Sequence, residues 1–437
     1  IPAEPCSAES EAPMGAVVDK FGALVAAQLP LHPERARFLL SNAYRLVGAQ
    51  MRYLPPRRLG RAQSYIQSVV SPGMGRALTR ADTCACVNVF LPCELLHAMD
   101  IPPMFPEGLS CYLTATAASA PFIQCAEEHG VPESYCSYHK LLLGLAESGV
   151  LPRPKVILNT SLACDANQLT FRRLAELYGV PRFTVDVPHW ETEETVPYVA
   201  DQLRAMGRFL SAHTGRPLSE ARLRTAVSRS REAHQAYQRY LSLRADRSMP
   251  DEMTTEMFTV MALHVLLGSP EGARYAGLLA QQASTLPKAA RSGIRLLWMH
   301  TLPYWQPSLK ELLNFSSRCE IVACDMNYAD LAEPDPDHPY ESMARRLLSC
   351  SYNGGVERRV ARTLEMAERL HADGVVYFCH WGCKQTSGGA GYAKSALERA
   401  GYPTLILDGD GCDTGNVNDG QMVTRMQAFL EQLGVQK

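Results

Sequence analysis

The feature of this sequence that most constrains its fold is a series of short apolar runs, each closed by turn or polar residues. Runs of about four to eight apolar residues are typical of strands buried in a parallel sheet. Helical segments separate these runs, and this alternation favours an α/β fold. The predicted strands form two groups, residues 87–92, 155–161 and 182–188, followed by residues 294–300, 320–326, 374–380 and 403–410.

Two further stretches are predicted to be helical. Phe21, Leu24, Val25 and Leu29 recur at helical spacing near the start, and residues 200–290 are also largely helical. We therefore predict two doubly wound, Rossmann- or flavodoxin-like parallel-sheet lobes with additional helical segments. The predicted domains are an N-terminal helical segment (1–83), a first α/β lobe (84–200), a helical connector (201–290) and a second α/β lobe (291–437).

The bulk composition excludes several classes of function. The 437 residues carry a net charge of −2, so we expect no basic surface for nucleic acid or an anionic membrane. The sequence has no run of about 18 apolar residues that would span a membrane. Residues 1–15 lack the pattern of a signal peptide. We therefore expect a cytoplasmic protein that binds neither nucleic acid nor membranes.

Fourteen cysteines are many for a protein in a reducing compartment, where disulfides are rare. Packing alone explains an individual thiol well, because free Cys is among the most buried residue types. Ligands of open α/β folds, however, bind outside the carboxyl ends of the strands. We therefore expect several thiols to converge on one cleft. Five of them end or follow predicted strands, namely Cys93, Cys164, Cys379, Cys383 and Cys412, and two lie in a linking segment, namely Cys125 and Cys136.

Three kinds of site would use such a group of thiols. Structural zinc sites use paired ligands on short knuckles, and the close pair Cys379 and Cys383 has no matching second pair. A nucleophilic Cys379 beside His380 would leave the other cysteines without a role. Single thiolates drawn from several strand ends suit an iron–sulfur cluster best. A zinc-bound binding module and a non-enzymatic electron carrier or cluster scaffold stay open as alternatives.

Five motifs resemble those of one enzyme superfamily. They are LPCELLHAMDIPPMFPE (91–107), ESYCSYHKLLLG (133–144), NTSLACDANQLTF (159–171), FCHWGCKQTSGG (378–389) and LDGDGCDTGN (407–416). On these motifs the chain is identified as a member of the 2-hydroxyacyl-CoA dehydratase and benzoyl-CoA reductase superfamily, and it most resembles the double-cubane-cluster proteins. The resemblance covers the chain from about residue 85 to the end and is weakest over residues 200–290.

The resemblance implies a set of iron–sulfur ligands. By motif, Cys93, Cys136 and Cys383 match the three ligands of a [4Fe–4S] cluster whose fourth iron is left open for a substrate oxygen or a small ligand. A double-cubane [8Fe–9S] cluster needs six thiolates, and a second set is available in this chain. That set is Cys125, Cys164 and Cys379, with Cys412 as a less favoured substitute. The presence of two cysteines in FCHWGC favours the cluster with six thiolate ligands.

The resemblance also implies a function. A separate ATP-hydrolysing iron–sulfur activator protein would supply low-potential electrons, which agrees with a sequence that has no GxxxxGK[ST] phosphate loop. Our first hypothesis is a reductase that acts on a small substrate at a double-cubane cluster. The alternative is the [4Fe–4S] subunit of a 2-hydroxyacyl-CoA dehydratase, which removes the 2-hydroxyl group through a ketyl radical. The protein would act as a homodimer or with a related second subunit.

Four side chains near the expected cluster are candidates for a chemical role. His97, His139 and His380 would relay protons or serve as structural hydrogen-bond donors. Lys384 would offset the charge of the cluster or lie at the surface as an ordinary lysine. The glycine-rich turn SGGAG (387–391) would bind a phosphate, such as one of coenzyme A, or form a plain strand-to-helix turn.

Overall fold

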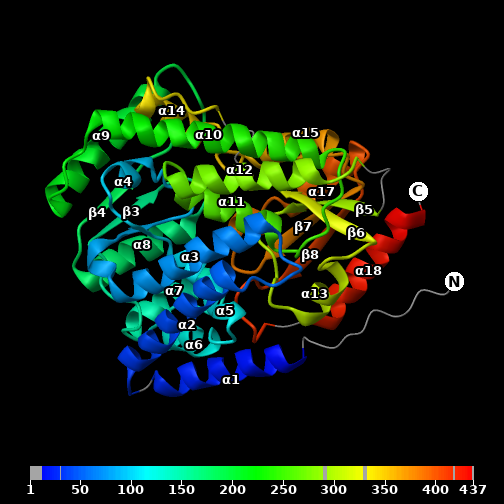
Figure 1. Cartoon of the computed structure of the whole chain (residues 1–437), viewed down its shortest axis with the longest axis horizontal. Helices are drawn as coiled ribbons and strands as arrows, with labels where there is room; N and C mark the ends of the chain where they lie inside the picture. Colours follow the sequence, from blue (N-terminus) through cyan, green and yellow to red (C-terminus); the bar gives the residue numbers. More distant parts are fainter. Residues whose placement is uncertain (1–11, 30, 289–292, 328–331, 417–418, 436–437) are drawn as a thin grey trace.

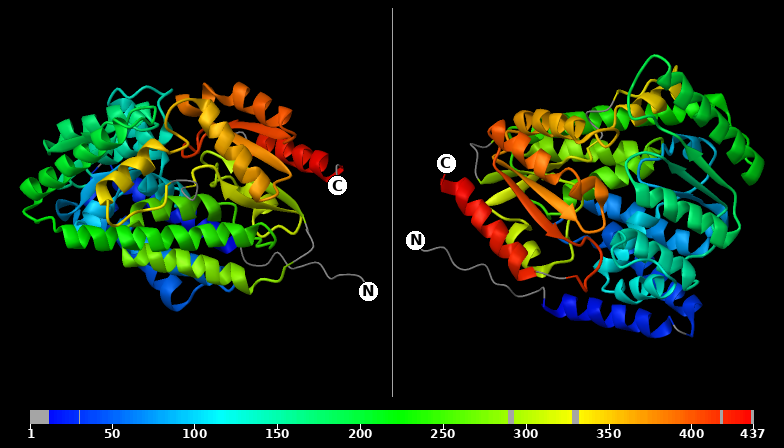
Figure 2. Two further views of the ribbon diagram at one scale, coloured as in Figure 1. Left: turned by 90° about the horizontal axis from the view of Figure 1, so that it is seen from above. Right: turned by 180° about the vertical axis from the view of Figure 1, so that it is seen from behind.

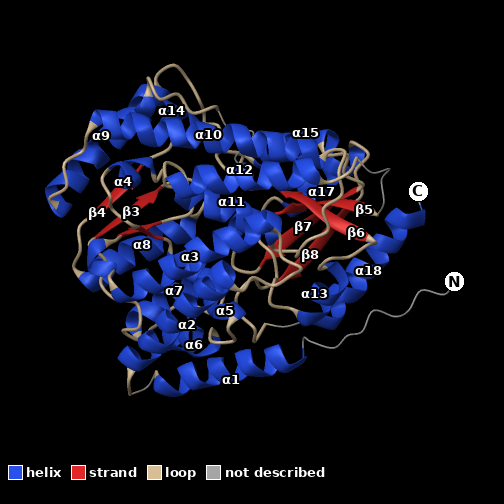
Figure 3. Ribbon diagram, viewed as in Figure 1, coloured by secondary structure: helices blue, strands red, loops and turns tan. Residues whose placement is uncertain are grey.

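Two parallel sheets organise the chain. The computed structural model describes residues 12–29, 31–288, 293–327, 332–416 and 419–435. Each sheet has four strands, and every strand pair is parallel (Figure 1). Helices enclose both sheets (Figure 3). The predicted α/β fold with two lobes is therefore confirmed.

The first sheet has the strand order β2–β1–β3–β4. Its strands are β1 (Ala85–Val87), β2 (Pro103–Met104), β3 (Val156–Thr160) and β4 (Arg182–Val185). Since β2 and β3 pair with opposite edges of β1, the chain changes direction across the sheet between β1 and β3. The loops that follow these two strands flank a crevice of the kind in which α/β folds bind ligands.

The second sheet repeats this arrangement with the order β6–β5–β7–β8. Its strands are β5 (Ile294–Met299), β6 (Cys319–Cys324), β7 (Gly374–His380) and β8 (Thr404–Gly409). All residues of β5 and β7 are buried, as expected for the central strands of a sheet that is covered on both faces. Here the topological switch point lies between β5 and β7.

The first sheet differs from the prediction in two places. The predicted strand at 87–92 is wrong, because β1 ends at Val87 and the following residues form a loop. The Asn88 side chain contributes to this early end of β1. It donates to Thr160 Oγ1 and accepts from the Thr160 backbone N–H, so it occupies hydrogen-bonding groups at the end of β3. Phe90 and Leu91 are nevertheless buried in the core. Strand β2 was not predicted, since two residues are too few to form a pattern.

Helices fill the space around and between the sheets. Those before and within the first lobe are α1 (Ala12–Gln28), α2 (Pro33–Tyr53), α3 (Arg61–Thr79), α4 (Glu94–Ala98), α5 (Pro106–Ala115), α6 (Ala120–Glu128), α7 (Ser137–Glu147) and α8 (Asp165–Tyr178). Those of the second lobe are α13 (Pro307–Leu313), α14 (Pro339–Leu348), α15 (Val356–Arg369), α16 (Lys384–Ser387), α17 (Ala390–Arg399) and α18 (Asp419–Val435).

Four helices connect the two lobes: α9 (Thr195–Thr214), α10 (Glu220–Arg244), α11 (Thr255–Leu266) and α12 (Pro270–Thr285). The long helix α10 contacts α4 of the first lobe and α14 of the second, while α11 contacts β6 and α12 contacts α3 (Figures 1 and 2). One buried apolar cluster runs through both lobes and these helices. The lobes are thus held in a fixed relation by a shared core. Among the helices of the described ranges, none is long and apolar enough to cross a bilayer.

Candidate functional site

A cavity of about 1690 Å³ lies where the two lobes meet the connector helices. It is larger than the roughly 300–1,000 Å³ of a pocket for a small ligand. Cys136 and Cys164 of the first lobe line it, together with His300 and Cys383 of the second. Because His300 follows β5 and Cys383 follows β7, the cavity lies at the switch point of the second sheet.

Three cysteine thiols on this cavity form a group. Cys136, Cys164 and Cys383 are the residues immediately before α7, α8 and α16. After burial, the proximity of Cys164 and Cys383 also raises the pKa of the Cys136 thiol, and Cys383 acts on the pKa of Cys164 in the same way. Thiols that are far apart in the sequence therefore lie near one another on one cavity.

A glycine makes the close approach of Cys383 and Cys136 possible. Gly382 has a φ of +76°, in the left-handed region that favours glycine. A Cβ atom at Gly382 would also lie 2.7 Å from the backbone nitrogen of Cys136. The glycine of the HWGC turn is therefore needed for its backbone conformation and for the contact between the lobes.

Each of the three thiols has a histidine beside it. The distance from Cys136 Sγ to His380 Nε2 is 3.3 Å, and that from Cys164 Sγ to His139 Nε2 is 3.6 Å. Cys383 Sγ lies 3.7 Å from His300 Nε2. All three imidazoles line the cavity. The site thus contains three cysteine–histidine pairs.

The hydrogen bonds of His380 determine which of its ring nitrogens carries the proton. The backbone N–H of Gly411 donates to His380 Nδ1 at 3.1 Å, so this nitrogen has no proton. The neutral ring must then carry its proton on Nε2, which faces Cys136 Sγ. The loop that holds Gly411 is itself fixed, since Asp410 Oδ1 accepts from the backbone nitrogens of Cys412 and Asp413. His380 is therefore set to donate to the Cys136 sulfur.

A buried ion pair holds His300. His300 has a φ of +73°, which is uncommon for a residue with a side chain. Its backbone N–H donates to Asp325 Oδ1 at 2.7 Å, and the Tyr352 hydroxyl donates to the same oxygen at 2.8 Å. Asp325 Oδ2 accepts from Arg359 Nε at 2.6 Å, and both charged side chains are almost fully buried. This network keeps the His300 ring beside Cys383.

Burial favours the neutral form of two of these thiols and of the three imidazoles. It raises the pKa of the Cys136 thiol well above its ordinary value and that of Cys164 to about 12. It also lowers the pKa of His139 to about 3, and the pKa values of His300 and His380 lie below their ordinary value for the same reason. A metal centre that bound here would displace the thiol protons.

The donor set suits an iron–sulfur cluster better than a single metal ion. Within the ranges that the structure describes, no three His, Cys, Asp or Glu side chains converge closely enough to bind one ion. In an iron–sulfur cluster each thiolate binds a different iron, so the ligands stand apart around the cluster. His139 Nδ1 is buried and has no hydrogen-bond partner among the described residues, a need that a bound group would meet.

The structure does not bring Cys93 to this group. Cys93 precedes α4, is 1% exposed and is not among the described residues that line the cavity. Its thiol donates to the Leu91 carbonyl oxygen at 3.5 Å. The next residue, Glu94, accepts two hydrogen bonds from Arg346 of α14, at 2.5 and 2.8 Å. This segment therefore joins the first lobe to α14.

Two other predicted ligands also lie off the cavity lining. Cys125 on α6 is partly exposed, and its thiol lies 3.8 Å from His129 Nδ1. Cys379 lies within β7, where successive side chains point to opposite faces, so it points away from the face of His380. It still interacts electrostatically with Cys383. Cys412 is buried beside Cys111.

The remaining candidates divide between the cavity and the surface. His97 borders the cavity, and its Nε2 lies 2.9 Å from the Val265 carbonyl oxygen. Lys384 is exposed and is not among the described lining residues. Nor are Gly388 and Gly389 of the SGGAG turn.

Sequence reasoning missed His300 and Glu107. His300 ends a predicted strand, so the rule that placed the cysteines at strand ends would also have found it. Glu107 ends the motif LPCELLHAMDIPPMFPE and lines the cavity. Burial raises its pKa to about 8, so its carboxyl group is neutral at pH 7.

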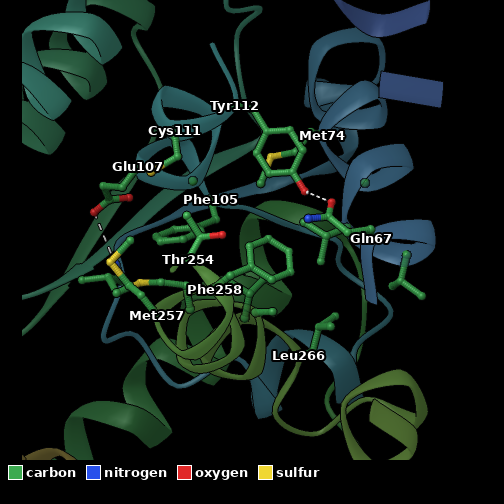
Figure 4. Close-up of a pocket in the computed structure, with 18 of the residues that line it drawn as sticks. Gln67, Met74, Phe105, Glu107, Cys111, Tyr112, Thr254, Met257, Phe258 and Leu266 are labelled. Atoms are coloured by element: carbon green, nitrogen blue, oxygen red, sulfur yellow. Dashed lines mark hydrogen bonds between the residues drawn. The ribbon is translucent and has the colours of Figure 1, made fainter. Parts of the chain in front are cut away.

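A large part of the cavity wall is apolar. Figure 4 shows Met74, Phe105, Met257, Phe258 and Leu266 gathered around one pocket, with Gln67 and Tyr112 at its edge. These side chains come from α3, from α5 and the residue before it, and from α11. The cavity thus joins a group of thiols to an apolar compartment.

Comparisons with known proteins point to one family. A family model described as 2-hydroxyglutaryl-CoA dehydratase, D-component, matches residues 88–433. Lactoyl-CoA dehydratase subunit alpha of Anaerotignum propionicum is 23% identical over 406 residues, which cover 85% of this chain and 95% of that protein. The (R)-2-hydroxyisocaproyl-CoA dehydratase alpha subunit of Clostridioides difficile is 22% identical over 359 residues, or 78% of this chain and 87% of that protein. A benzoyl-CoA reductase subunit from Thauera aromatica is 21% identical over 385 residues, or 79% of this chain and 88% of that protein.

Proposed function

The chain belongs to the 2-hydroxyglutaryl-CoA dehydratase D-component family, and from this premise we propose that it is the iron–sulfur subunit of an enzyme that dehydrates a 2-hydroxyacyl-CoA thioester. The predicted superfamily is confirmed. The names of the relatives favour the dehydratase alternative over the double-cubane reductase that was our first hypothesis. The observation that carries the proposal is the set of three cysteine–histidine pairs on a cavity large enough for a thioester.

The proposed ligands of a [4Fe–4S] cluster are Cys136, Cys164 and Cys383. This set differs at one position from the set implied by the resemblance, since Cys164 takes the place of Cys93. The support is that Cys164 borders the cavity and interacts with the other two thiols. With three thiolates, one iron of the cluster would have no protein ligand.

A single cluster is better supported than a double cubane. Six thiolates would have to face the cavity, yet Cys125 and Cys379 are not among its described lining residues. The interaction between Cys379 and Cys383 is the observation that favours the double cubane. Iron content separates the two, at about four or about eight iron atoms per chain.

In the proposed reaction the substrate loses its 2-hydroxyl group and a proton from the neighbouring carbon. The products are water and a 2-enoyl thioester, so there is no net oxidation or reduction. When bound, the cluster would supply an electron at low potential and an open iron for a substrate oxygen. The protein's part is to hold the thiolates, to donate a hydrogen bond from His380 Nε2 to Cys136, and to exclude water with the apolar wall.

The coenzyme A part of the substrate has candidate partners at the border of the cavity. Arg52, Arg58 and Arg76 line the cavity, and all three are exposed. Guanidinium groups bind phosphate oxygens in a bidentate manner. We assign the phosphates of coenzyme A to this border.

The proposal includes partners. The relatives are named as subunits, so a second, related subunit is proposed for this chain, with a homodimer as the alternative. A separate ATP-hydrolysing activator protein would deliver the electron. The proposed location is the cytoplasm, where free thiols persist.

Anaerobic purification and reconstitution test this proposal. We expect about four iron atoms and about four acid-labile sulfides per chain. The electron paramagnetic resonance spectrum of the reduced protein should change when a 2-hydroxyacyl-CoA is added and stay the same with coenzyme A alone. About eight iron atoms per chain would favour the double cubane instead. A colourless protein that contains zinc and no labile sulfide would contradict both.

A further inference from the structure

The pocket of Figure 4 is lined mainly by apolar side chains, which indicates the kind of acyl chain that it can bind. Met74 and Phe105 form one side, and Met257, Phe258 and Leu266 of α11 form the other. Met74, Phe105 and Met257 are buried, while Phe258 and Leu266 are partly buried and pack against the core. We call these five residues the apolar pocket. An apolar group placed among them would be removed from water, which favours its binding.

The apolar pocket and the three thiols line one cavity. Cys111, at the edge of the pocket, is one of the groups that act on the pKa of Tyr138, after burial. The Tyr138 ring packs edge-on against the His380 ring, with 5.2 Å between the ring centres, and His380 contacts Cys136. Cys111, Tyr138 and His380 all line the same cavity. A molecule whose reacting atoms lie at the thiols can therefore extend along the same cavity to the apolar pocket.

The polar groups at the edge of the pocket are neutral. Gln67 Oε1 accepts from the Tyr112 hydroxyl at 2.9 Å and from Ser71 Oγ at 3.3 Å. These two donors orient the amide, and Figure 4 shows its nitrogen turned toward the pocket. Glu107, on the same wall, holds a proton at pH 7 for the reason given above. The pocket edge thus offers hydrogen bonds but no positive charge.

No arginine or lysine among the described residues that line the cavity is fully buried. Among the described lining residues, Arg52, Arg58 and Arg76 are exposed, and Arg229 and Lys310 are partly buried. A carboxylate inserted among the side chains of the apolar pocket would lose its hydration without a buried cation to replace it. The pocket therefore discriminates against an acyl chain that ends in a second carboxylate.

Part of the pocket lies outside the residues that the family model matches. Gln67 and Met74 belong to α3, which ends at Thr79, before the matched residues 88–433 begin. A difference in the side chains that line a pocket is one way in which enzymes that share a reaction come to prefer different substrates.

We infer that the substrate of this enzyme carries a bulky apolar acyl chain, branched aliphatic or aromatic, and no second carboxylate. This inference rests on the proposed function and specifies the substrate class of the same site. The acyl chain lies in the apolar pocket between Met74 and Phe258, and the thioester end extends to the thiols. Gln67 Nε2 is available as a donor to the thioester or hydroxyl oxygen.

Binding of unreactive thioesters to the reconstituted protein tests the inference. 4-Methylpentanoyl-CoA, glutaryl-CoA and free coenzyme A are compared by anaerobic isothermal titration calorimetry; neither thioester has a 2-hydroxyl group to lose. We expect 4-methylpentanoyl-CoA to bind at least about tenfold more tightly than glutaryl-CoA, since its two methyl groups enter the pocket and the carboxylate is excluded. Free coenzyme A should bind more weakly than 4-methylpentanoyl-CoA.

A variant pair localises the effect. Phe258→Ala should weaken binding of 4-methylpentanoyl-CoA about tenfold and leave the affinity for free coenzyme A unchanged. The matched control is Phe38→Ala on α2, where the side chain is 67% exposed and does not border the cavity. This control should bind every ligand as the parent protein does. Circular dichroism of both variants checks that they are folded.

The outcomes separate the inference from the proposed function. Equal or tighter binding of glutaryl-CoA would overturn the inference and leave the proposed function in place. Unchanged affinities in Phe258→Ala would overturn the placement of the acyl chain. If neither thioester bound, the proposed function itself would fail, and the inference with it.

Discussion

The buried pair Asp325–Arg359 gives the sharpest prediction about stability, because it also holds a residue of the site. Asp325 is 3% exposed and Arg359 is 2% exposed, and their ion pair is 2.6 Å long. The Arg359 guanidinium also lies over the rings of Tyr352 and Tyr377, at 4.4 and 5.2 Å from their centres. Asp325→Ala removes one charge and leaves the other buried without its partner.

The expected loss follows from these contacts. Removing one partner of a buried ion pair costs about 3–5 kcal/mol, because the remaining charge stays out of water. Two further hydrogen bonds, from His300 N and the Tyr352 hydroxyl, are lost as well. We predict that Asp325→Ala lowers the free energy of unfolding of the cluster-free protein by about 4 kcal/mol, measured by urea unfolding. The double variant Asp325→Ala, Arg359→Met tests the coupling between the two residues. Its free energy of unfolding should be at least about 1 kcal/mol higher than that of Asp325→Ala, because the unpaired charge is gone.

A control on the same helix separates burial from charge. Arg362 of α15 pairs with Glu365 at 2.7 Å, but both side chains are exposed. Arg362→Ala should change the free energy of unfolding by less than about 0.5 kcal/mol. The argument is refuted if Asp325→Ala costs less than about 1 kcal/mol, or if the double variant is no more stable than the single one.

Three further predictions concern the site. Replacing His380 with Leu removes the hydrogen bond to the Cys136 sulfur, so the reduction potential of the reconstituted cluster should fall in a redox titration followed by electron paramagnetic resonance; an unchanged potential would count against the assigned tautomer. Glu107 has a pKa raised from 4.5 to about 8, so the native protein retains a proton that the unfolded chain loses, and its stability should fall as pH rises through this interval. Glu107→Gln cannot ionise and should avoid that loss, which amounts to about 5 kcal/mol over the whole interval, whereas parallel pH profiles of the two proteins would contradict the assignment. Gly382→Ala places a Cβ atom 2.7 Å from Cys136 N at a φ of +76°, and it should lower the iron content after reconstitution, while Gly391→Ala, which meets no atom within 4 Å, should not.

Much of the fold was predictable from local patterns. Strands β3 to β8 all overlap predicted runs, and the signal is clearest for β3, β5 and β7, which are buried along their whole length and so lack an alternation of polar residues. Strand β1 was misplaced because the apolar run continues through Phe90 and Leu91, which are buried in a loop and not in the sheet. No periodicity distinguishes a buried loop from a buried strand over so few residues.

The site was predictable only in part. The rule that ligands lie at strand ends placed Cys164 and Cys383 on the cavity. The same rule could not exclude Cys379 as a ligand. Strand β7 continues through Cys379 to His380, so the two side chains point to opposite faces of the sheet. Nor could sequence alone reveal that Gln67 and Phe258 border one pocket, because α3 and α11 meet only through the packing of the whole chain.

The account depends most on the claim that Cys136, Cys164 and Cys383 hold one iron–sulfur cluster. Iron and acid-labile sulfide in anaerobically reconstituted Cys164→Ala and Cys93→Ala test it directly, because the two thiols differ in whether they border the cavity. We predict that Cys164→Ala loses most of both elements and that Cys93→Ala retains them at the level of the parent protein. Full retention in Cys164→Ala, together with loss in Cys93→Ala, would contradict the account.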